Sequence, residues 1–266
     1  MPKIKFKYKV VDADKAKYGE GYAFKSLSKK DYNSFNPKVL GLGDISRDGE
    51  YVQALAAVFD LEGFTSFSNQ VDSHLVIPEF LQRFLDWLFA ELANKFKEGE
   101  TAQTVTVWGK LPFFAKFLGD GILFLWDTID IDSFNDISNI VAILHRINCA
   151  YETDFLSEIE RHVSKPPSKL RCGVARGQVI SVGDGNDYVG SCINIASRLQ
   201  KLSQLSFAIS RRGFDLSKGE FAQTWGKEFT LKKVELRGIG TEELVYIKKK
   251  EFETLTSTER RFFKSS

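Results

Sequence analysis

Val58-Phe59-Asp60-Leu61-Glu62-Gly63-Phe64-Thr65-Ser66-Phe67-Ser68 is the stretch of sequence from which the fold is best inferred. The apolar run from Ala54 to Phe59 has the length of a buried strand, and it ends on the carboxylate of Asp60. Gly63 follows, and the Thr- and Ser-rich residues after it are typical of the start of a helix. Because backbone N–H groups that open onto a helix can bind phosphate, residues 61–64 are a candidate phosphate cradle.

A second motif, Lys116-Phe117-Leu118-Gly119-Asp120-Gly121, predicts a hairpin with Asp120 at its tip, since an apolar strand follows it. If this hairpin pairs beside the first strand, Asp60 and Asp120 meet at one end of the sheet. Two neighbouring carboxylates repel each other unless a cation lies between them, and their hard oxygens suit Mg²⁺ or Mn²⁺. Taken alone, each motif is better explained as an ordinary strand end or turn, where Asp is common, and only the combination of motifs favours a metal site.

A third motif, Asp187 to Leu199, predicts a helix that Gly190 opens. Asn194 and Arg198 are four residues apart and therefore share one face of it. An amide and a guanidinium presented together suit a sugar and a phosphate. Taken alone, the motif is better explained as an ordinary helix start with solvated polar residues.

The composition is that of a globular protein with one large domain, or one domain with extensions. A net charge of +2 over 266 residues gives no strong field for nucleic acid or membrane. The three cysteines, Cys149, Cys172 and Cys192, form no CxxC motif and are expected to be buried free thiols, which fits a reducing interior. No signal peptide or spanning helix is apparent, so a cytoplasmic protein is expected.

The order of the predicted elements is that of an α+β fold, without a Gly-rich dinucleotide fingerprint. Residues 3–10 alternate lysine with apolar side chains, which predicts a strand, and 1–49 as a whole is expected to be this strand plus an irregular wrap around the core. Residues 50–250 form the main domain, and 251–266 a basic tail. A helix is expected over 77–96 with Pro78 in its first turn, and two strands are expected to join at Arg176-Gly177.

Together, these motifs resemble the catalytic domains of class III nucleotidyl cyclases, the adenylate and guanylate cyclase superfamily. The resemblance covers residues 51–248 and rests on FDLEGFT (59–65), KFLGDG (116–121) and YVGSCINIASRL (188–199). It implies a ferredoxin-like βαββαβ sheet over residues 50–250. It also implies a head-to-tail homodimer with two active sites at its interface.

The resemblance also assigns roles to individual residues. Asp60, Asp120 and the backbone of Leu61 match the ligands of two divalent cations, Mg²⁺ or Mn²⁺. Asn194 matches the residue that orients the ribose, and Arg198 the one that stabilises the transition state, both from the opposite subunit. The triphosphate-binding positions are matched by Glu62, Gly63, Phe64, Thr65 and Arg237, the last of which stands where the family usually has a lysine.

The nucleobase is less well defined by these motifs. In purine cyclases, a Lys four residues before the second metal Asp and an Asp seven before the ribose Asn select adenine. Lys116 and Asp187 fall on these positions, which favours ATP as substrate and cAMP as product. However, the segment from Gly177 to Gly190 is short for the corresponding arm, so the reach of Asp187 to a base stays open.

The layout of the whole chain favours a pyrimidine instead. A cyclase domain with its own N-terminal segment and no sensor or membrane domain is similar to the bacterial pyrimidine cyclases of anti-phage (Pycsar) defence. Those enzymes convert UTP or CTP into a cyclic mononucleotide that activates a separate effector protein. The resemblance therefore implies UTP and cUMP ahead of CTP and cCMP.

Three other classes of protein compete with this interpretation. A catalytically silent, nucleotide-binding cyclase homologue is expected to lack one of the four key residues, and none is missing here. A palm-type polymerase or diguanylate cyclase is expected to carry Gly-Gly-Asp/Glu-Glu/Phe at the hairpin, where this chain has Leu-Gly-Asp-Gly. A nucleic-acid-binding protein is disfavoured by the nearly balanced charge.

Overall fold

The computed structural model describes residues 7–12, 17, 20, 23–107, 109–129, 134–202, 205–213 and 216–265. The chain divides into two compact units. The N-terminal unit comprises Met1–Glu50 and Ile180–Val189, and the main unit comprises Tyr51–Val179 and Gly190–Ser266. Each unit is described by itself.

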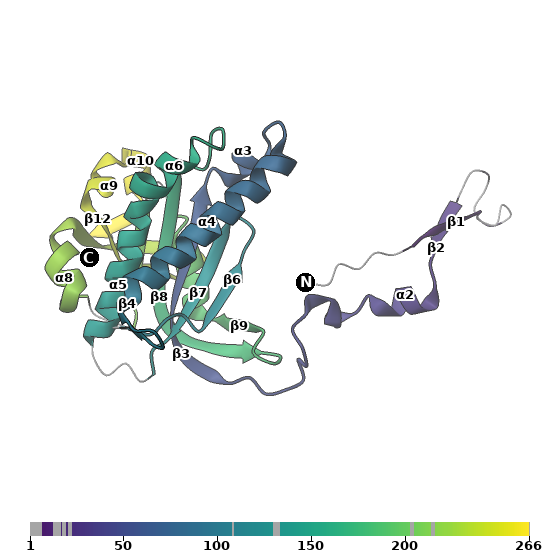
Figure 1. The fold of residues 1–266 in the computed structure, drawn as a ribbon, viewed down its shortest axis with the longest axis horizontal. Helices are drawn as coiled ribbons and strands as arrows, with labels where there is room; N and C mark the ends of the chain where they lie inside the picture. Colours follow the sequence, from purple (N-terminus) through teal and green to yellow (C-terminus); the bar gives the residue numbers. More distant parts are fainter. Residues whose placement is uncertain are drawn as a thin grey trace. The chain divides into compact units, whose positions relative to one another are not determined.

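The main unit is built on a large mixed sheet with the strand order β13-β11-β12-β10-β8-β3-β7-β6 (Figure 1). The end of β8 and most of β9, which pairs with β8, belong to the N-terminal unit. The order β8-β3-β7-β6 is the 4-1-3-2 order of a ferredoxin-like βαββαβ unit, as predicted. The strands are β3 (Tyr51–Glu62), β6 (Phe114–Phe117), β7 (Gly121–Asp127), β8 (Lys169–Val182), β9 (Asp187–Gly190), β10 (Phe207–Ser210), β11 (Phe229–Leu236), β12 (Gly240–Lys248) and β13 (Phe263–Ser265). A separate two-stranded sheet consists of β4 (Lys97–Glu100) and β5 (Val105–Val107).

The two faces of the sheet are covered by different helices. Leu55, Ala57 and Phe59 of β3 join the aromatic core that includes side chains of α4 (Ser73–Phe96) and α5 (Phe134–Ala150), two helices that cross the same face in Figure 1. The alternate β3 residues point to the opposite face, where they too are buried. The helix α7 (Ser191–Leu199) packs on β3 and covers that face.

Close packing of α7 depends on Gly173 in β8. An ideal Cβ on Gly173 would lie 2.1 Å from the carbonyl oxygen of Ala196 and 2.7 Å from the amide nitrogen of Gln200. No side chain fits at these distances, so the backbone of α7 rests directly on the strand. The sequence of β8 therefore determines how closely the helix that carries Asn194 and Arg198 approaches the sheet.

Three predicted element boundaries are wrong. α4 begins at Ser73 after an N-cap residue, Asp72, in the left-handed region (φ 61°), so Pro78 lies in its second turn rather than its first. β8 is one continuous strand through Arg176-Gly177, not two. The third is the last strand, because residues after Lys248 also join the sheet, where β13 pairs with β11 and Phe263 is buried.

The remaining helices of the main unit are short. The helix α5 continues through a π-helical stretch, η2 (Tyr151–Leu156), into α6 (Ser157–Ile159).

All three cysteines are free, and Cys149 is exposed rather than buried. No helix in the described part of the chain is long and apolar enough to span a membrane. The other helical segments are α3 (Phe64–Ser68), α8 (Gly219–Trp225), η3 (Gly226–Glu228), α9 (Lys249–Thr254) and α10 (Ser257–Arg260).

The N-terminal unit contains a two-stranded antiparallel sheet of β1 (Lys9–Asp12) and β2 (Ala23–Ser26). Two short helical segments follow, α2 (Lys29–Ser34) and η1 (Pro37–Leu40). The irregular wrap predicted for this region therefore contains regular elements. Of the strand predicted over 3–10, residues 3–6 lie outside the described residues, and β1 begins only at Lys9.

Candidate functional site

Asp60 and Asp120 lie together at one end of the central sheet. β3 pairs antiparallel with β7 so that Asp60 is opposite Gly121, and the amide nitrogen of Leu61 donates to the carbonyl oxygen of Asp120 at 2.9 Å. This approach requires a glycine at position 121, because an ideal Cβ there would lie 2.1 Å from the carbonyl oxygen of Phe59. The two strand ends that the sequence singles out are therefore neighbours.

The Asp60 carboxylate is buried and paired with Arg171, a residue that the sequence motifs do not reveal. Arg171 donates to Oδ2 of Asp60 from Nη2 at 2.6 Å and from Nε at 3.1 Å. Burial raises the pKa of Asp60, the Arg171 guanidinium opposes that shift, and nearby Asp120 adds to it. The available signal was an arginine inside the otherwise apolar stretch Leu170 to Ala175.

The turn after β3 has the geometry of a sharp bend into α3. Gly63 adopts φ 84°, a left-handed conformation that favours glycine, and its carbonyl oxygen accepts from the amide of Phe67 at 2.9 Å. Phe64 is half-buried and Thr65 is exposed. The Glu62 carboxylate lies 3.9 Å from Nζ of Lys169. Its charge is therefore directed toward a strand lysine.

Asn194 and Arg198 lie on one face of α7, as predicted. The guanidinium of Arg198 donates from Nη1 to the carbonyl oxygen of Asn194 at 3.1 Å and from Nε to the carbonyl oxygen of Arg237 at 2.6 Å. Arg237 is exposed in the turn between β11 and β12. This hydrogen bond therefore joins α7 to the β11–β12 turn, which carries the predicted triphosphate-binding residue Arg237.

Solved structures with similar folds include the adenylyl cyclase CyaB from P. aeruginosa, at 14% identity and a TM-score of 0.55, covering 76% of this chain and 96% of that one. The guanylyl cyclase Cya2 aligns at 16% identity and a TM-score of 0.54, covering 76% and 94%. A bacterial light-regulated adenylyl cyclase aligns at 14% identity and a TM-score of 0.51, covering 80% of this chain and 55% of that one. The fold is that of the class III nucleotidyl cyclases. No protein-family model and no curated protein sequence matches the chain.

Within this class III cyclase fold, the donor chemistry at the strand ends fits a divalent cation. The described residues contain no cluster of three or more His, Cys, Asp or Glu side chains. Mg²⁺ is commonly bound by only one or two carboxylates, with substrate phosphates completing the coordination. Asp60 and Asp120 supply two such groups, and the Leu61 backbone carbonyl, also at the end of β3, is a third candidate ligand.

The two candidate base-recognition residues belong to different units of the cyclase fold. Lys116 lies in β6 of the main unit, opposite Leu123 of β7, and is half-buried. Asp187 begins β9 in the N-terminal unit, and its Oδ1 accepts from the amide of Tyr188 at 2.9 Å. This hydrogen bond is local to the hairpin. The structure does not bring the two residues together within one unit.

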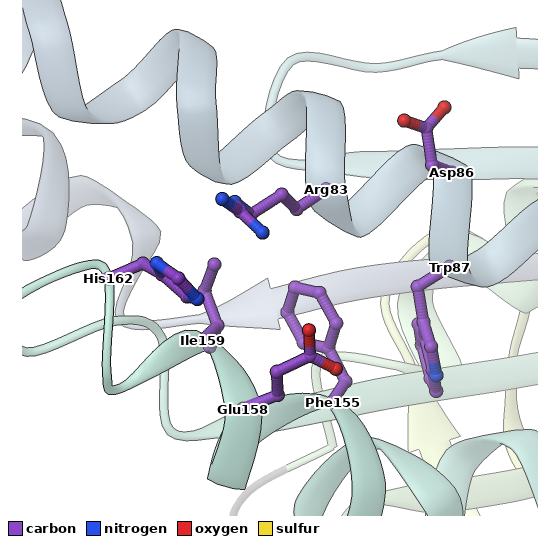
Figure 2. Close-up of a pocket in the computed structure, with 7 residues that line it drawn as sticks. All are labelled: Arg83, Asp86, Trp87, Phe155, Glu158, Ile159 and His162. Carbon is purple, nitrogen blue, oxygen red and sulfur yellow. The ribbon is translucent and has the colours of Figure 1, made fainter.

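A cavity of about 260 Å³ lies elsewhere in the main unit, between α4 and the η2–α6 segment (Figure 2). Phe155 and Ile159 line it, and the guanidinium of Arg83 points toward His162. None of the candidate site residues lines this cavity. The cavity is therefore separate from the candidate residues at the end of the sheet and on α7.

Proposed function

We propose that this chain is a nucleotidyl cyclase, with the activity carried by residues 50–250. It converts a nucleoside triphosphate into a 3′,5′-cyclic nucleoside monophosphate and pyrophosphate, which makes it a phosphorus–oxygen lyase. The observation that carries the proposal is the meeting of Asp60 and Asp120 at adjacent strand ends within a cyclase fold. Two carboxylates beside a glycine turn are the protein part of a site for phosphoryl chemistry.

Asp60, Asp120 and the Leu61 carbonyl would hold two divalent cations, Mg²⁺ or Mn²⁺. Bound cations would lower the pKa of the ribose 3′-hydroxyl and neutralise charge on the triphosphate. Arg171 prepares the site, since its guanidinium opposes the rise in the pKa of Asp60 that burial causes. The carboxylate is thereby favoured in its ionised, ligating form.

The remaining residues act on the substrate. Glu62 to Thr65 present backbone N–H groups to the triphosphate, and Arg237 adds a positive side chain there. Asn194 holds the ribose by hydrogen bonds. The 3′-hydroxyl gives its proton to water, its oxygen attacks the α-phosphorus in line, the bond to the bridging oxygen breaks, and pyrophosphate leaves with the electron pair. Arg198 balances the negative charge that develops on the α-phosphate oxygens.

In this proposal the active enzyme is a homodimer. Asn194 and Arg198 of one copy complete the site formed by Asp60 and Asp120 of the other. The guanidinium of Arg198 donates a hydrogen bond to the backbone carbonyl oxygen of Arg237. One α7 helix and one β11–β12 turn would therefore enter the partner's site together.

For the nucleobase we favour a pyrimidine, with UTP converted to cUMP and CTP a less favoured substrate. The support is the likeness of this chain, a cyclase fold with its own N-terminal segment, to the pyrimidine cyclases of anti-phage defence. The cyclic product would then act in the cytoplasm on a separate effector protein. The alternative is ATP, supported by Lys116 and Asp187 at the positions that select adenine. A silent nucleotide-binding homologue is a second alternative, disfavoured because all four key residues are present.

Incubation of purified chain with each of the four nucleoside triphosphates and Mn²⁺, followed by mass spectrometry of the products, tests these alternatives. The proposal predicts cyclic UMP and pyrophosphate. Product from ATP alone would overturn the pyrimidine assignment and leave the cyclase assignment standing. No cyclic product from any of the four would support the silent homologue.

A further inference from the structure

The guanidinium of Arg171 meets the Asp60 carboxylate in an unsymmetrical way. Nη2 of Arg171 donates at 2.6 Å and Nε at 3.1 Å, and both hydrogen bonds go to the same oxygen, Oδ2. An arginine frequently pairs two of its nitrogens with the two oxygens of a carboxylate instead. Because each carboxylate oxygen has two lone pairs, these two donors fill Oδ2, and neither of them uses Oδ1. The two oxygens of Asp60 are therefore not equivalent for a further ligand.

The sheet fixes this arrangement. Arg171 lies inside β8, where its neighbours Leu170 and Cys172 are buried in the core on the other face of the strand. The amide of Cys172 donates to the carbonyl oxygen of Ser206 at 2.7 Å, just before β10. The side chains of Arg171 and Asp60 are only 19% and 6% exposed. Water therefore competes little with the pair, and the guanidinium is held at Oδ2.

A second ion pair joins the same two strands, and it is looser. Lys169 lies two residues before Arg171 on β8, and Glu62 lies two residues after Asp60 on β3, so both pairs are on the same face of the sheet. Nζ of Lys169 lies 3.9 Å from Oε2 of Glu62, which is too long for a hydrogen bond. Both basic residues add positive charge beside the site, but of the two it is Arg171 that covers an oxygen of Asp60.

Magnesium and calcium ions differ in what they require of a carboxylate. Mg²⁺ demands a nearly regular octahedron of oxygens at about 2.0–2.1 Å, and the two oxygens of one carboxylate are too close together to occupy two of its corners. Ca²⁺ accepts longer distances, about 2.3–2.6 Å, and binds a carboxylate through one oxygen or through both. With Oδ2 covered, Asp60 offers a cation one oxygen, Oδ1. Such a ligand suits Mg²⁺ and denies Ca²⁺ the two-oxygen mode.

We propose that Arg171 is a positioning residue that makes the Asp60 site select Mg²⁺ over Ca²⁺, because it occupies Oδ2 and reserves Oδ1 for the cation. This inference rests on the proposed function in one respect, since it takes from it that Asp60 binds a divalent cation. The carboxylates of Asp60 and Asp120 by themselves suit either ion. Arg171 adds the selectivity by acting through Asp60, without itself being a ligand of the cation.

Competition for bound Mn²⁺ tests the inference without nucleotide and without turnover. Free Mn²⁺ gives an electron paramagnetic resonance signal that broadens on binding, so displacement of Mn²⁺ by Mg²⁺ and by Ca²⁺ gives the affinity for each ion. The chief variant is Arg171→Lys, which keeps a positive charge beside the buried carboxylate but lacks the rigid fork that covers Oδ2. The ratio of Ca²⁺ affinity to Mg²⁺ affinity should rise by about tenfold.

Lys169→Met is the control for charge. It removes a positive charge two residues along β8 and acts on Mg²⁺ and Ca²⁺ alike, so the ratio of affinities should stay at the wild-type value. An unchanged ratio in Arg171→Lys, or an equal rise in Lys169→Met, would overturn the inference. Mn²⁺ binding by Asp60→Asn as strong as that of the wild type would also overturn it, since the cation would then not be held by Asp60.

Cyclic-nucleotide formation by the wild type is measured separately with Mg²⁺. An active wild type with an unchanged ratio in Arg171→Lys removes the role of Arg171 and leaves the cyclase. A raised ratio in Arg171→Lys with an inactive wild type supports the selective cation site and removes the cyclase.

Discussion

At the scale of single residues, the Asp60–Arg171 pair is the least expected part of the site. Removing one partner of a buried ion pair leaves an uncompensated charge, which typically costs about 3–5 kcal/mol. Arg171→Met should therefore lower the free energy of unfolding by about 3 kcal/mol, measured by denaturant titration. Adding Asp60→Asn should recover part of the loss, because the remaining buried group is then neutral.

The matched control for Arg171 is Lys233→Met. Nζ of Lys233 lies 3.4 Å from Oε2 of Glu242, whose side chain is 58% exposed, so this is a surface ion pair. Such pairs contribute about 0–1 kcal/mol. Equal losses for Arg171→Met and Lys233→Met would show that Arg171 has no special role at Asp60.

His145 makes the stability of the main unit depend on pH. The ring is buried against Phe207, Trp225 and Phe229, and burial, helped by Lys248 and Arg146, lowers its pKa from 6.5 to about 3. Below pH 6.5 the unfolded chain therefore binds a proton that the folded chain does not, and stability falls as the pH falls toward 3. Between pH 7.5 and 5.0 the loss of folding free energy from this residue should be about 2 kcal/mol.

Denaturant titrations of the wild type and of His145→Leu at pH 7.5 and pH 5.0 measure this effect. The variant should lose about 2 kcal/mol less than the wild type over that interval, since leucine cannot bind the proton. The same acid-dependent loss in both proteins would mean that the sensitivity to pH arises at other residues.

At the scale of elements, the sequence predicts the hairpin at Asp120 and the helix that starts after Gly190, because both depend on local turn and helix-start patterns. It does not predict the continuity of β8, because Arg176-Gly177 reads locally as a turn. In the structure Gly177 lies close to α7, with its ideal Cβ 3.3 Å from Cβ of Cys192. Arg176 meanwhile binds Thr128 and Gly213, which are distant in sequence.

The same distinction explains the other differences. Arg171 finds its partner 111 residues away, and no local pattern encodes such a pairing. Because proline is common in first turns, the sequence predicts a helix that begins just before Pro78. α4 instead begins at Ser73, about one turn earlier. Local sequence patterns thus identify the candidate site residues, whereas contacts between residues distant in sequence determine which side chains position them.

Gly173 provides a test of how α7 is positioned. In Gly173→Ala the new methyl group would meet the backbone of α7, so we expect a loss of stability of about 3 kcal/mol and reduced turnover. Gly99→Ala is the control, since an ideal Cβ at Gly99 has no atom within 4 Å, and it should change stability by less than about 0.5 kcal/mol. Thermal and denaturant unfolding of both variants measure the difference. A Gly173→Ala protein as stable as Gly99→Ala would contradict the close packing of α7 on β8.

At the scale of the whole molecule, the proposed sharing of sites between two copies predicts complementation. As homodimers, Asp60→Ala should be inactive, and Arg198→Ala should turn over about 10²–10³-fold more slowly than the wild type. In an equimolar mixture, half of the dimers are mixed and each mixed dimer has one intact site. Activity should therefore recover to about a quarter of the wild-type rate. Proven mixed dimers without recovery would contradict shared sites.

The most direct test of the central claim, that Asp60 and Asp120 together form the catalytic metal site, is turnover by Asp120→Asn. The contact of Asp120 with β3 is made by its backbone carbonyl, so the fold should be retained. Asp127→Asn, at the far end of the same strand, is the control. With Mn²⁺ and the preferred nucleotide, Asp127→Asn should form cyclic nucleotide and pyrophosphate at the wild-type rate. Asp120→Asn should form neither product. Wild-type turnover by a folded Asp120→Asn protein would contradict the account.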